Sequence, residues 1–255
     1  MHMNDLEIRH KKDSDREKEE IKKFFSFKEN GICVEVGSNE PQDLNSQSYY
    51  LEKDLNWKCF LVEANPKLVQ KTKISRPKAE ILNFACVEPK KNKQLVTLYI
   101  PLNKKNIEIS GHAAVEKNID EHNYEKFREV SVQGRTLSDI LEIFQVKEID
   151  ILSIDVEGYE YEVLLGLNFD LCSPKLILLE DKNLYLNKHN ILVKNGYKLA
   201  RRLNRNSWYL RHDIKAPKIH LSHKIRIYKR LYLSLWYNKI KYSITHKTIK
   251  PFIKL

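Results

Sequence analysis

Short apolar runs alternate with helix-like segments over most of the chain, and several of these runs end in an acidic residue. The runs lie at residues 31–36, 58–64, 79–85, 149–155 and 174–181. Strands that alternate with helices need right-handed crossovers, which place helices against both faces of a mostly parallel sheet. The pattern therefore predicts an α/β fold with helices on both faces of such a sheet.

Further local signals complete the expected elements. Residues 94–100 form another strand-like run, and the polar residues 103–128 are expected to cross the mouth of a site as loop and helix. Pro66 suits the first turn of a helix, and the Thr136 hydroxyl can cap another. The chain between 197 and 212 is expected to close the sheet as an antiparallel hairpin.

Charge divides the chain into a slightly acidic body and a strongly basic end. The 255 residues carry a net charge of +11, and the segment from Arg201 onward holds 15 Lys or Arg against one acid, Asp213. That segment therefore carries +14, and residues 1–200 carry −3. We expect three parts, which are a solvated charged helix or arm at 1–25, an α/β domain at 26–212 and a basic helical extension at 213–255.

Composition excludes several classes of protein. With 42% hydrophobic residues and few Gly and Pro, the chain is expected to fold rather than stay disordered. No run approaches the roughly 18 to 20 apolar residues of a spanning helix, and the N-terminal residues lack the apolar core of a signal peptide. The four cysteines are isolated and lack metal-finger spacing. We therefore expect a cytoplasmic protein with reduced thiols.

Polar residues follow the apolar runs at the ends where ligands bind in open parallel sheets. These ends carry Glu35 with Gly37, then Glu63, then Asp155, and finally Glu180 with Asp181. Because the carboxyl ends of parallel strands meet at one edge of the sheet, these side chains are expected to line a single crevice.

The loop after the first strand disfavours a ligand that carries phosphates. Gly37 lets the backbone turn sharply and approach a ligand. The residues GSNEPQ at 37–42 offer one glycine and the acid Glu40, where the dinucleotide fingerprint GxGxxG would admit a pyrophosphate. Glu63 stands 26 residues after Gly37, where an acid accepts hydrogen bonds from the two hydroxyls of a nucleoside ribose. The cationic, phosphate-free donor S-adenosylmethionine fits this pocket best.

Several runs occur in an order that resembles one enzyme family. They are VEVGSN at 34–39, SYYLEKDLNWKCFLVEANP at 48–66, ILNFACV at 81–87, RTLSDIL at 135–141 and IDILSIDVEGYEYEVLLGL at 149–167. Together they resemble the FkbM family of S-adenosylmethionine-dependent methyltransferases over residues 31–182. The resemblance implies a Rossmann-like class I methyltransferase fold with a mostly parallel seven-stranded sheet. It also implies O-methylation, often of sugar or polyketide-derived hydroxyls.

The resemblance further implies a set of residues that bind the methyl donor. They are Glu35, Gly37, Ser38 and Asn39 around the methionine part, Glu63 and Ala64 at the ribose, Asn83 and Ala85 at the adenine, Ser110 in the segment that closes over the donor, and Asp155. The region NEPQDL lacks a second glycine that many members of the family have.

Three acids at the ends of neighbouring strands predict a metal site. Asp155, Glu180 and Asp181 offer the hard oxygen ligands that Mg²⁺ prefers, and the ion would orient a vicinal diol and stabilise a developing alkoxide. Alternatively, Asp155 and Glu157 cap the helix that follows them, and Glu180 with Asp181 caps the next. Asp155 is also a catalytic candidate, and Glu157 is expected to position the substrate or the loop rather than to bind the metal.

Two histidines are candidates for the base that removes the acceptor's proton. His112 lies in the segment expected to close over the donor, and His189 follows the acidic pair. A neutral imidazole titrates near working pH, and this favours His112. A surface position without a catalytic role is the alternative for either histidine.

The basic extension carries an apolar and aromatic stripe at helical spacing. The stripe consists of Leu221, Ile225, Tyr228, Tyr232, Leu235 and Trp236, and it is flanked by Lys224, Lys229, Arg230, Lys239 and Lys241. Such a helix suits the headgroup layer of an anionic membrane. We expect residues 221–255 to attach the protein to the inner membrane face. Packing of the stripe on the α/β domain or in a homodimer is the alternative.

The leading functional hypothesis is methylation of a sugar hydroxyl in a surface glycan or glycolipid. An alternative is an inactive Rossmann scaffold that binds nucleic acid through its basic end, although no RNP, zinc or helix-turn-helix signature supports it. A glycosyltransferase would need a phosphate partner, which the loop at 37–42 does not offer.

Overall fold

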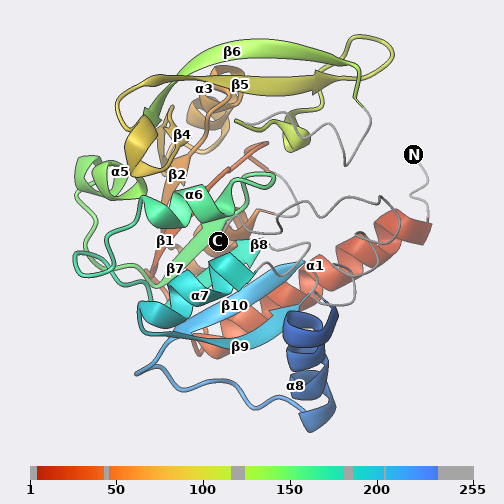
Figure 1. The fold of residues 1–255 in the computed structure, drawn as a ribbon, viewed down its shortest axis with the longest axis vertical. Coiled ribbons are helices and arrows are strands. Elements are labelled where there is room, and N and C mark those ends of the chain that lie inside the picture. Colours follow the sequence, from red (N-terminus) through yellow and green to blue (C-terminus); the bar gives the residue numbers. More distant parts are fainter. Residues whose placement is uncertain (1–4, 43–45, 116–123, 181–185, 204, 235–255) are drawn as a thin grey trace, which may run out of the picture.

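The computed structural model describes residues 5–42, 46–115, 124–180, 186–203 and 205–234 (Figure 1). Seven strands form its main sheet in the order β3-β2-β1-β7-β8-β10-β9. They are β1 (Ile32–Val36), β2 (Lys58–Val62), β3 (Glu80–Leu82), β7 (Ile151–Ile154), β8 (Leu176–Glu180), β9 (Tyr197–Leu203) and β10 (Asn206–Arg211). Neighbouring strands from β3 to β8 are parallel, and β10 is antiparallel to β8 and β9. This confirms the expected Rossmann-like α/β fold with its closing hairpin.

Helices cover both faces of the main sheet, as the sequence predicts. One face packs against α5 (Leu137–Ile143), α6 (Glu160–Leu165) and α7 (Leu186–Lys194), and the other against α1 (Asp5–Phe24), α2 (Gln47–Leu55) and α3 (Pro66–Ser75). Pro66 is in the first turn of α3, and the Thr136 hydroxyl accepts a hydrogen bond of 3.2 Å from the Asp139 N–H at the start of α5. Both helix starts are therefore those that the sequence predicts.

The parallel strands are apolar on both sides because helices cover both sides. In β1, Val34 and Val36 pack on the α5–α7 side, whereas Cys33 packs on the side of α1 and α2. Glu35 shares the side of Cys33, since successive side chains of a strand alternate between the two faces. Each fully buried valine or leucine contributes roughly 1.5–3 kcal/mol to folding.

A second, three-stranded sheet in the order β4-β6-β5 lies beyond the edge of the main sheet (Figure 1). Its strands are β4 (Ala85–Cys86), β5 (Leu95–Leu102) and β6 (Lys126–Arg135), and two 3-10 turns, η1 (Pro89–Lys91) and η2 (Ser110–His112), lie beside them. The apolar run at 79–85 is therefore divided between β3 and β4. The run at 94–100 belongs to β5, which pairs antiparallel with β6 and not with the main sheet.

The N-terminal helix α1 is packed against the protein along one side, which corrects the expectation of a solvated helix or arm. Ile21 is fully buried in the core between α1, α2 and the sheet. The Glu17 carboxylate is also buried, and it accepts hydrogen bonds from Trp208 Nε1 at 3.0 Å and from Asn206 Nδ2 at 2.7 Å. Helix α1 is thus fixed to the C-terminal hairpin of the sheet.

The four cysteines are free and buried, as the sequence predicts. Beyond the main sheet, α8 (Leu221–Tyr228) continues into a π-helical turn, η3 (Lys229–Ser234). Among the helices that the structure describes, none is both long enough and apolar enough to cross a membrane.

The buried Glu17 makes a prediction about stability. Removal from water raises its pKa from about 4.5 to about 7, despite the hydrogen bonds from Trp208 and Asn206 that favour the charged form. Because the folded-state pKa is raised, ionisation destabilises the fold as the pH rises, by about 3 kcal/mol between pH 4.5 and 7. In Glu17→Gln, the free energy of unfolding should change less over this range in denaturant titrations. Glu19→Gln, an exposed neighbour on the same helix, should keep the wild-type pH dependence.

Candidate active site

A cleft that is open to solvent lies at the carboxyl ends of β1, β2 and β7. Its acidic lining consists of Glu63, Asp155 and Glu157. Gly37, Asn39, Ala64, Ala85 and Ser110, all of them predicted donor-binding positions, also line it. The structure therefore brings most of the residues expected around the donor to one place.

Gly37 brings the ends of β1 and β7 into direct contact. Its φ angle is +82°, and a Cβ atom at this position would lie 1.8 Å from the carbonyl oxygen of Asp155. Its N–H donates a 2.9 Å hydrogen bond to the Val62 carbonyl at the end of β2. A residue with a side chain cannot occupy this position without moving the Asp155 backbone.

Glu63 is buried at the end of β2 with its carboxylate in the cleft lining. The two oxygens accept hydrogen bonds from the Asn39 N–H at 2.9 Å and the Asn65 N–H at 2.7 Å. Burial raises the pKa of this carboxyl above its usual value, although these backbone groups favour the charged form. These two N–H groups hold the Glu63 carboxylate in one orientation at the edge of the cleft.

Two predicted donor-binding residues support the cleft from outside its lining. Asn83 Nδ2 donates hydrogen bonds to the carbonyls of Glu63 at 2.8 Å and Ala64 at 2.9 Å, and so it fixes the loop after β2. Ser38 is buried but is not one of the residues that line the cleft. Its N–H donates to the Val62 carbonyl at 3.3 Å.

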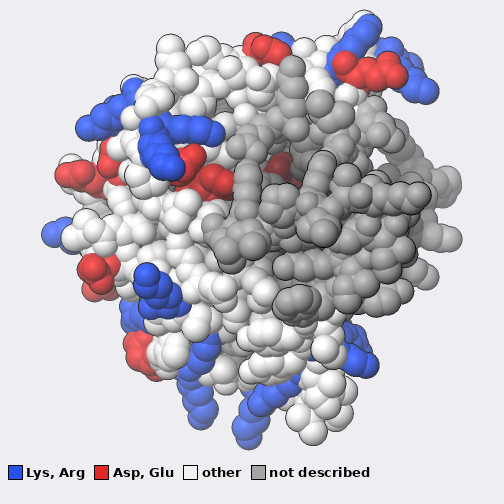
Figure 2. Space-filling model, viewed as in Figure 1, with Lys and Arg blue, Asp and Glu red and all other residues white. Residues whose placement is uncertain are grey.

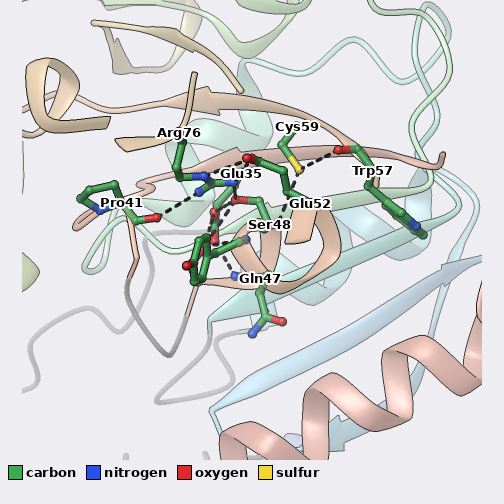
Figure 3. Close-up of polar contacts among 10 residues, drawn as sticks. Glu35, Pro41, Gln47, Ser48, Glu52, Trp57, Cys59 and Arg76 are labelled. Carbon is green, nitrogen blue, oxygen red and sulfur yellow. Dashed lines mark hydrogen bonds and ion pairs between the residues drawn. The ribbon is translucent and has the colours of Figure 1, made fainter. Parts of the chain in front are cut away.

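Glu35 does not line the cleft, which corrects its expected place beside the donor. Its carboxylate accepts hydrogen bonds from the Gln47 N–H at 2.7 Å and the Ser46 hydroxyl at 2.9 Å, and another from the Ser48 hydroxyl (Figure 3). The side chain points to the α2 face because it alternates with Val36 along β1. Glu35 therefore anchors the first turn of α2.

A buried arginine continues this network on the side away from the cleft (Figure 3). Arg76 donates to Glu52 through Nε at 3.1 Å and Nη2 at 2.7 Å, and to Ser48 Oγ at 3.0 Å. Its side chain is 1% exposed, so this ion pair is largely shielded from solvent. The network links α2 to the end of α3.

Three carboxylates gather where β7 and β8 end. Ligand oxygens of Asp155, Glu157 and Glu180 all lie within 4.8 Å of one another. Desolvation and the negative charge of Glu180 raise the pKa of Asp155 well above the usual value, although the residue is exposed. Glu157, expected only to position substrate or loop, is thus a member of the cluster, and Asp181 lies outside the described residues.

A buried ion pair supports the loop that carries Glu157. Lys188 Nζ on α7 lies 3.2 Å from Glu160 Oε2, and the other oxygen of Glu160 accepts a 2.8 Å hydrogen bond from the Gly158 N–H. Glu157 and Gly158 both have positive φ angles, 52° and 100°, so this loop needs such support. The sequence analysis missed Lys188, since a lysine on a helix is ordinarily exposed.

Neither candidate histidine belongs to the cleft lining. His112 Nδ1 lies 2.6 Å from the Tyr124 hydroxyl. Its neighbours Ser110 and Gly111 line the cleft. His189 Nδ1 lies 3.2 Å from the Tyr209 hydroxyl, beside the sheet. Of the predicted catalytic residues, Asp155 and Glu157 are therefore the ones that line the cleft.

Several lining residues were not predicted from the sequence. They are Phe84, Leu98, Ala113, Ala114 and Val115. Ala114 is held there because its N–H and carbonyl pair with Tyr99 on β5, at 3.1 and 2.9 Å. The second sheet thus supplies the apolar wall of the cleft, opposite the ends of the main strands.

Comparison with protein families gives a match to the methyltransferase FkbM domain over residues 35–199. The chain belongs to the FkbM methyltransferase family. This supports its assignment as an S-adenosylmethionine-dependent methyltransferase. A comparison with curated proteins finds no match.

Solved structures of low sequence identity are similar to this FkbM protein. Magnesium protoporphyrin IX methyltransferase from Synechocystis PCC 6803, with bound S-adenosylmethionine, is 11% identical, with a TM-score of 0.43 over 83% of this chain and 86% of that one. A TehB-like S-adenosylmethionine-dependent methyltransferase from Corynebacterium glutamicum is 6% identical, with a TM-score of 0.40 over 75% of this chain and 86% of that one.

The lining suits the methyl donor of the FkbM family. Its charged groups are the carboxylates of Glu63, Asp155 and Glu157, and no described lining residue is Lys or Arg. A cationic sulfonium and ammonium match this charge, whereas a phosphate would be repelled. Alanines and Gly111 leave room along the apolar wall for a flat base.

The contact at Gly37 is open to a direct test. Gly37→Ala should lower the free energy of unfolding by several kcal/mol in denaturant titrations, because strain and a backbone clash add together. Gly196→Ala is the matched control, with a φ of +84° and no atom within 4 Å of the added Cβ. It should cost about 1 kcal/mol. Equal losses in the two variants would contradict the role given to the Asp155 contact.

Proposed function

We propose that this FkbM methyltransferase transfers the methyl group of S-adenosylmethionine to a hydroxyl of a sugar, in a glycan or glycolipid, with Mg²⁺ bound beside the donor. The observation that carries the proposal is the arrangement of carboxylates, with Glu63 on one side of the cleft and the cluster of Asp155, Glu157 and Glu180 on the other. Glu63 suits the ribose of the methyl donor. The cluster suits a metal ion and the sugar that accepts the methyl group.

The donor side of the proposal rests on Glu63. A carboxylate held by two backbone N–H groups keeps lone pairs that can accept the 2′ and 3′ hydroxyls of a ribose. The short distance between Gly37 and Asp155 keeps the loop after β1 narrow and leaves its backbone close to the bound donor. When bound, S-adenosylmethionine supplies an electrophilic methyl group for in-line displacement by an oxygen nucleophile.

The acceptor side rests on the acidic cluster. Asp155, Glu157 and Glu180 would hold Mg²⁺ through carboxylate oxygens, and the ion would supply Lewis acidity toward a hydroxyl. A sugar offers two neighbouring hydroxyls, which suit such an ion better than one isolated hydroxyl does.

A donor-binding measurement tests the first half of the proposal. In isothermal titration calorimetry, Glu63→Gln should bind S-adenosylhomocysteine about 10- to 100-fold more weakly than the wild type, since hydrogen bonds to a charged group contribute about 1.5–3 kcal/mol. Glu80→Gln, on the exposed edge of β3, is the control and should retain wild-type affinity. Absence of binding by the folded wild-type protein would favour the inactive-scaffold alternative instead.

A second measurement separates the metal from the donor. Glu180 belongs to the acidic cluster but is not one of the residues that line the cleft, so Glu180→Gln should leave the affinity for S-adenosylhomocysteine nearly unchanged. Methyl transfer to a panel of sugars should fall in this variant and should also fall when EDTA is added to the wild type. Full activity of the wild-type protein in excess EDTA would remove Mg²⁺ from the proposal.

A further inference from the structure

We propose that α8 and η3 form a docking surface for an anionic lipid bilayer, separate from the donor cleft. The helix begins at Leu221, passes into the π-helical turn at Lys229 and ends its described part at Ser234. In Figure 1 it lies at one end of the molecule, below β9 and away from the second sheet. The inference does not depend on which acceptor the enzyme methylates.

One side of this helix fixes it to the protein. Ile227 and Leu231 are 8% and 1% exposed, and they are one turn apart. Tyr232, at the border between this side and the outward side, also makes an edge contact with His189 of α7, with ring centroids 6.4 Å apart. The helix is therefore held in a defined orientation on the body of the enzyme, so its outward side is fixed as well.

The outward side carries an exposed apolar stripe. Leu221, Ile225, Tyr228 and Tyr232 follow one another at steps of four, three and four residues, and their exposed fractions are 67%, 53%, 62% and 45%. The rings of Tyr228 and Tyr232 are stacked, with centroids 6.1 Å apart. Apolar and aromatic side chains that are exposed together on one face of a helix indicate an interaction surface.

Basic side chains border the stripe. Lys224, Arg226 and Lys229 are exposed on α8 and η3. The sequence from residue 214 to residue 255 contains no Asp or Glu. Figure 2 shows blue side chains around a mostly white surface at the lower end of the view, where α8 lies in Figure 1.

This combination favours lipid over other partners. Each basic residue near an anionic leaflet contributes about 1 kcal/mol, and the tyrosines and aliphatic side chains can enter the headgroup layer. RNA would neutralise the cations but would leave the aliphatic side chains Leu221 and Ile225 in water. A second copy of the chain would bring like charges together at this face.

Vesicle sedimentation with the full-length protein tests the proposal. The wild type should bind vesicles of phosphatidylcholine mixed with phosphatidylglycerol at least about tenfold more tightly than vesicles of phosphatidylcholine alone, and added salt should weaken this binding. The variant Leu221→Ser with Ile225→Ser should lose most of it. The control Ile74→Ser with Leu171→Ser, which removes two even more exposed apolar side chains elsewhere, should not.

Charge-reversal variants test the basic residues of this surface independently of the apolar stripe. Lys224→Glu with Lys229→Glu should weaken binding to the anionic vesicles, whereas Lys73→Glu with Lys78→Glu, exposed residues on and after α3, should have little effect. Binding of S-adenosylhomocysteine should be unchanged in all four variants and shows that they are folded. Equal binding of the wild type to both kinds of vesicle would overturn the proposal, as would unchanged binding by the stripe variant. The proposal would also be rejected if RNA bound to this face while vesicles did not.

Discussion

The close approach of Gly37 to the Asp155 carbonyl is the constraint on which the active site depends. It brings the ends of β1 and β7 into contact, and the Gly37 N–H ties both to the end of β2 through Val62. Three strand ends are thereby held at fixed distances. The acids that follow them, Glu63 and Asp155, face one cleft because the backbone beneath them leaves no other arrangement.

Polar groups outside the cleft hold its loops in place. Glu35 and Asn83 were expected to touch the donor, but they anchor α2 and the loop after β2 instead. Lys188 and Glu160 do the same for the strained loop at Glu157. Glu35, Asn83 and Glu160 replace water as partners for backbone N–H or carbonyl groups, so the loops can be ordered before any ligand binds.

The sequence was sufficient for the main sheet and for the acids at its edge, and insufficient for much of the rest. Largely apolar runs such as 149–155 identify strands that are buried on both faces. Glu35 lies away from the cleft because strand alternation directs its side chain to the face opposite Val36. Strand β6 was not predicted because its sequence, KFREVSVQGR, is mostly polar and lacks a sustained apolar run. The lining residues Ala113 and Ala114 are positioned by the pairing of Ala114 with Tyr99 of β5. No local sequence pattern reveals this long-range pairing.

The hydrogen bond between Glu17 and Trp208 spans 191 residues of sequence. During synthesis on the ribosome, α1 emerges before the strands of the main sheet, and the indole that donates to Glu17 follows 191 residues later. Helix α1 therefore cannot dock before the strands of the main sheet have been synthesised, and its docking is a late step of folding. Its abundant charge keeps such a waiting segment soluble, which gives the mixed-charge character of the N-terminal residues a role in biogenesis rather than in catalysis.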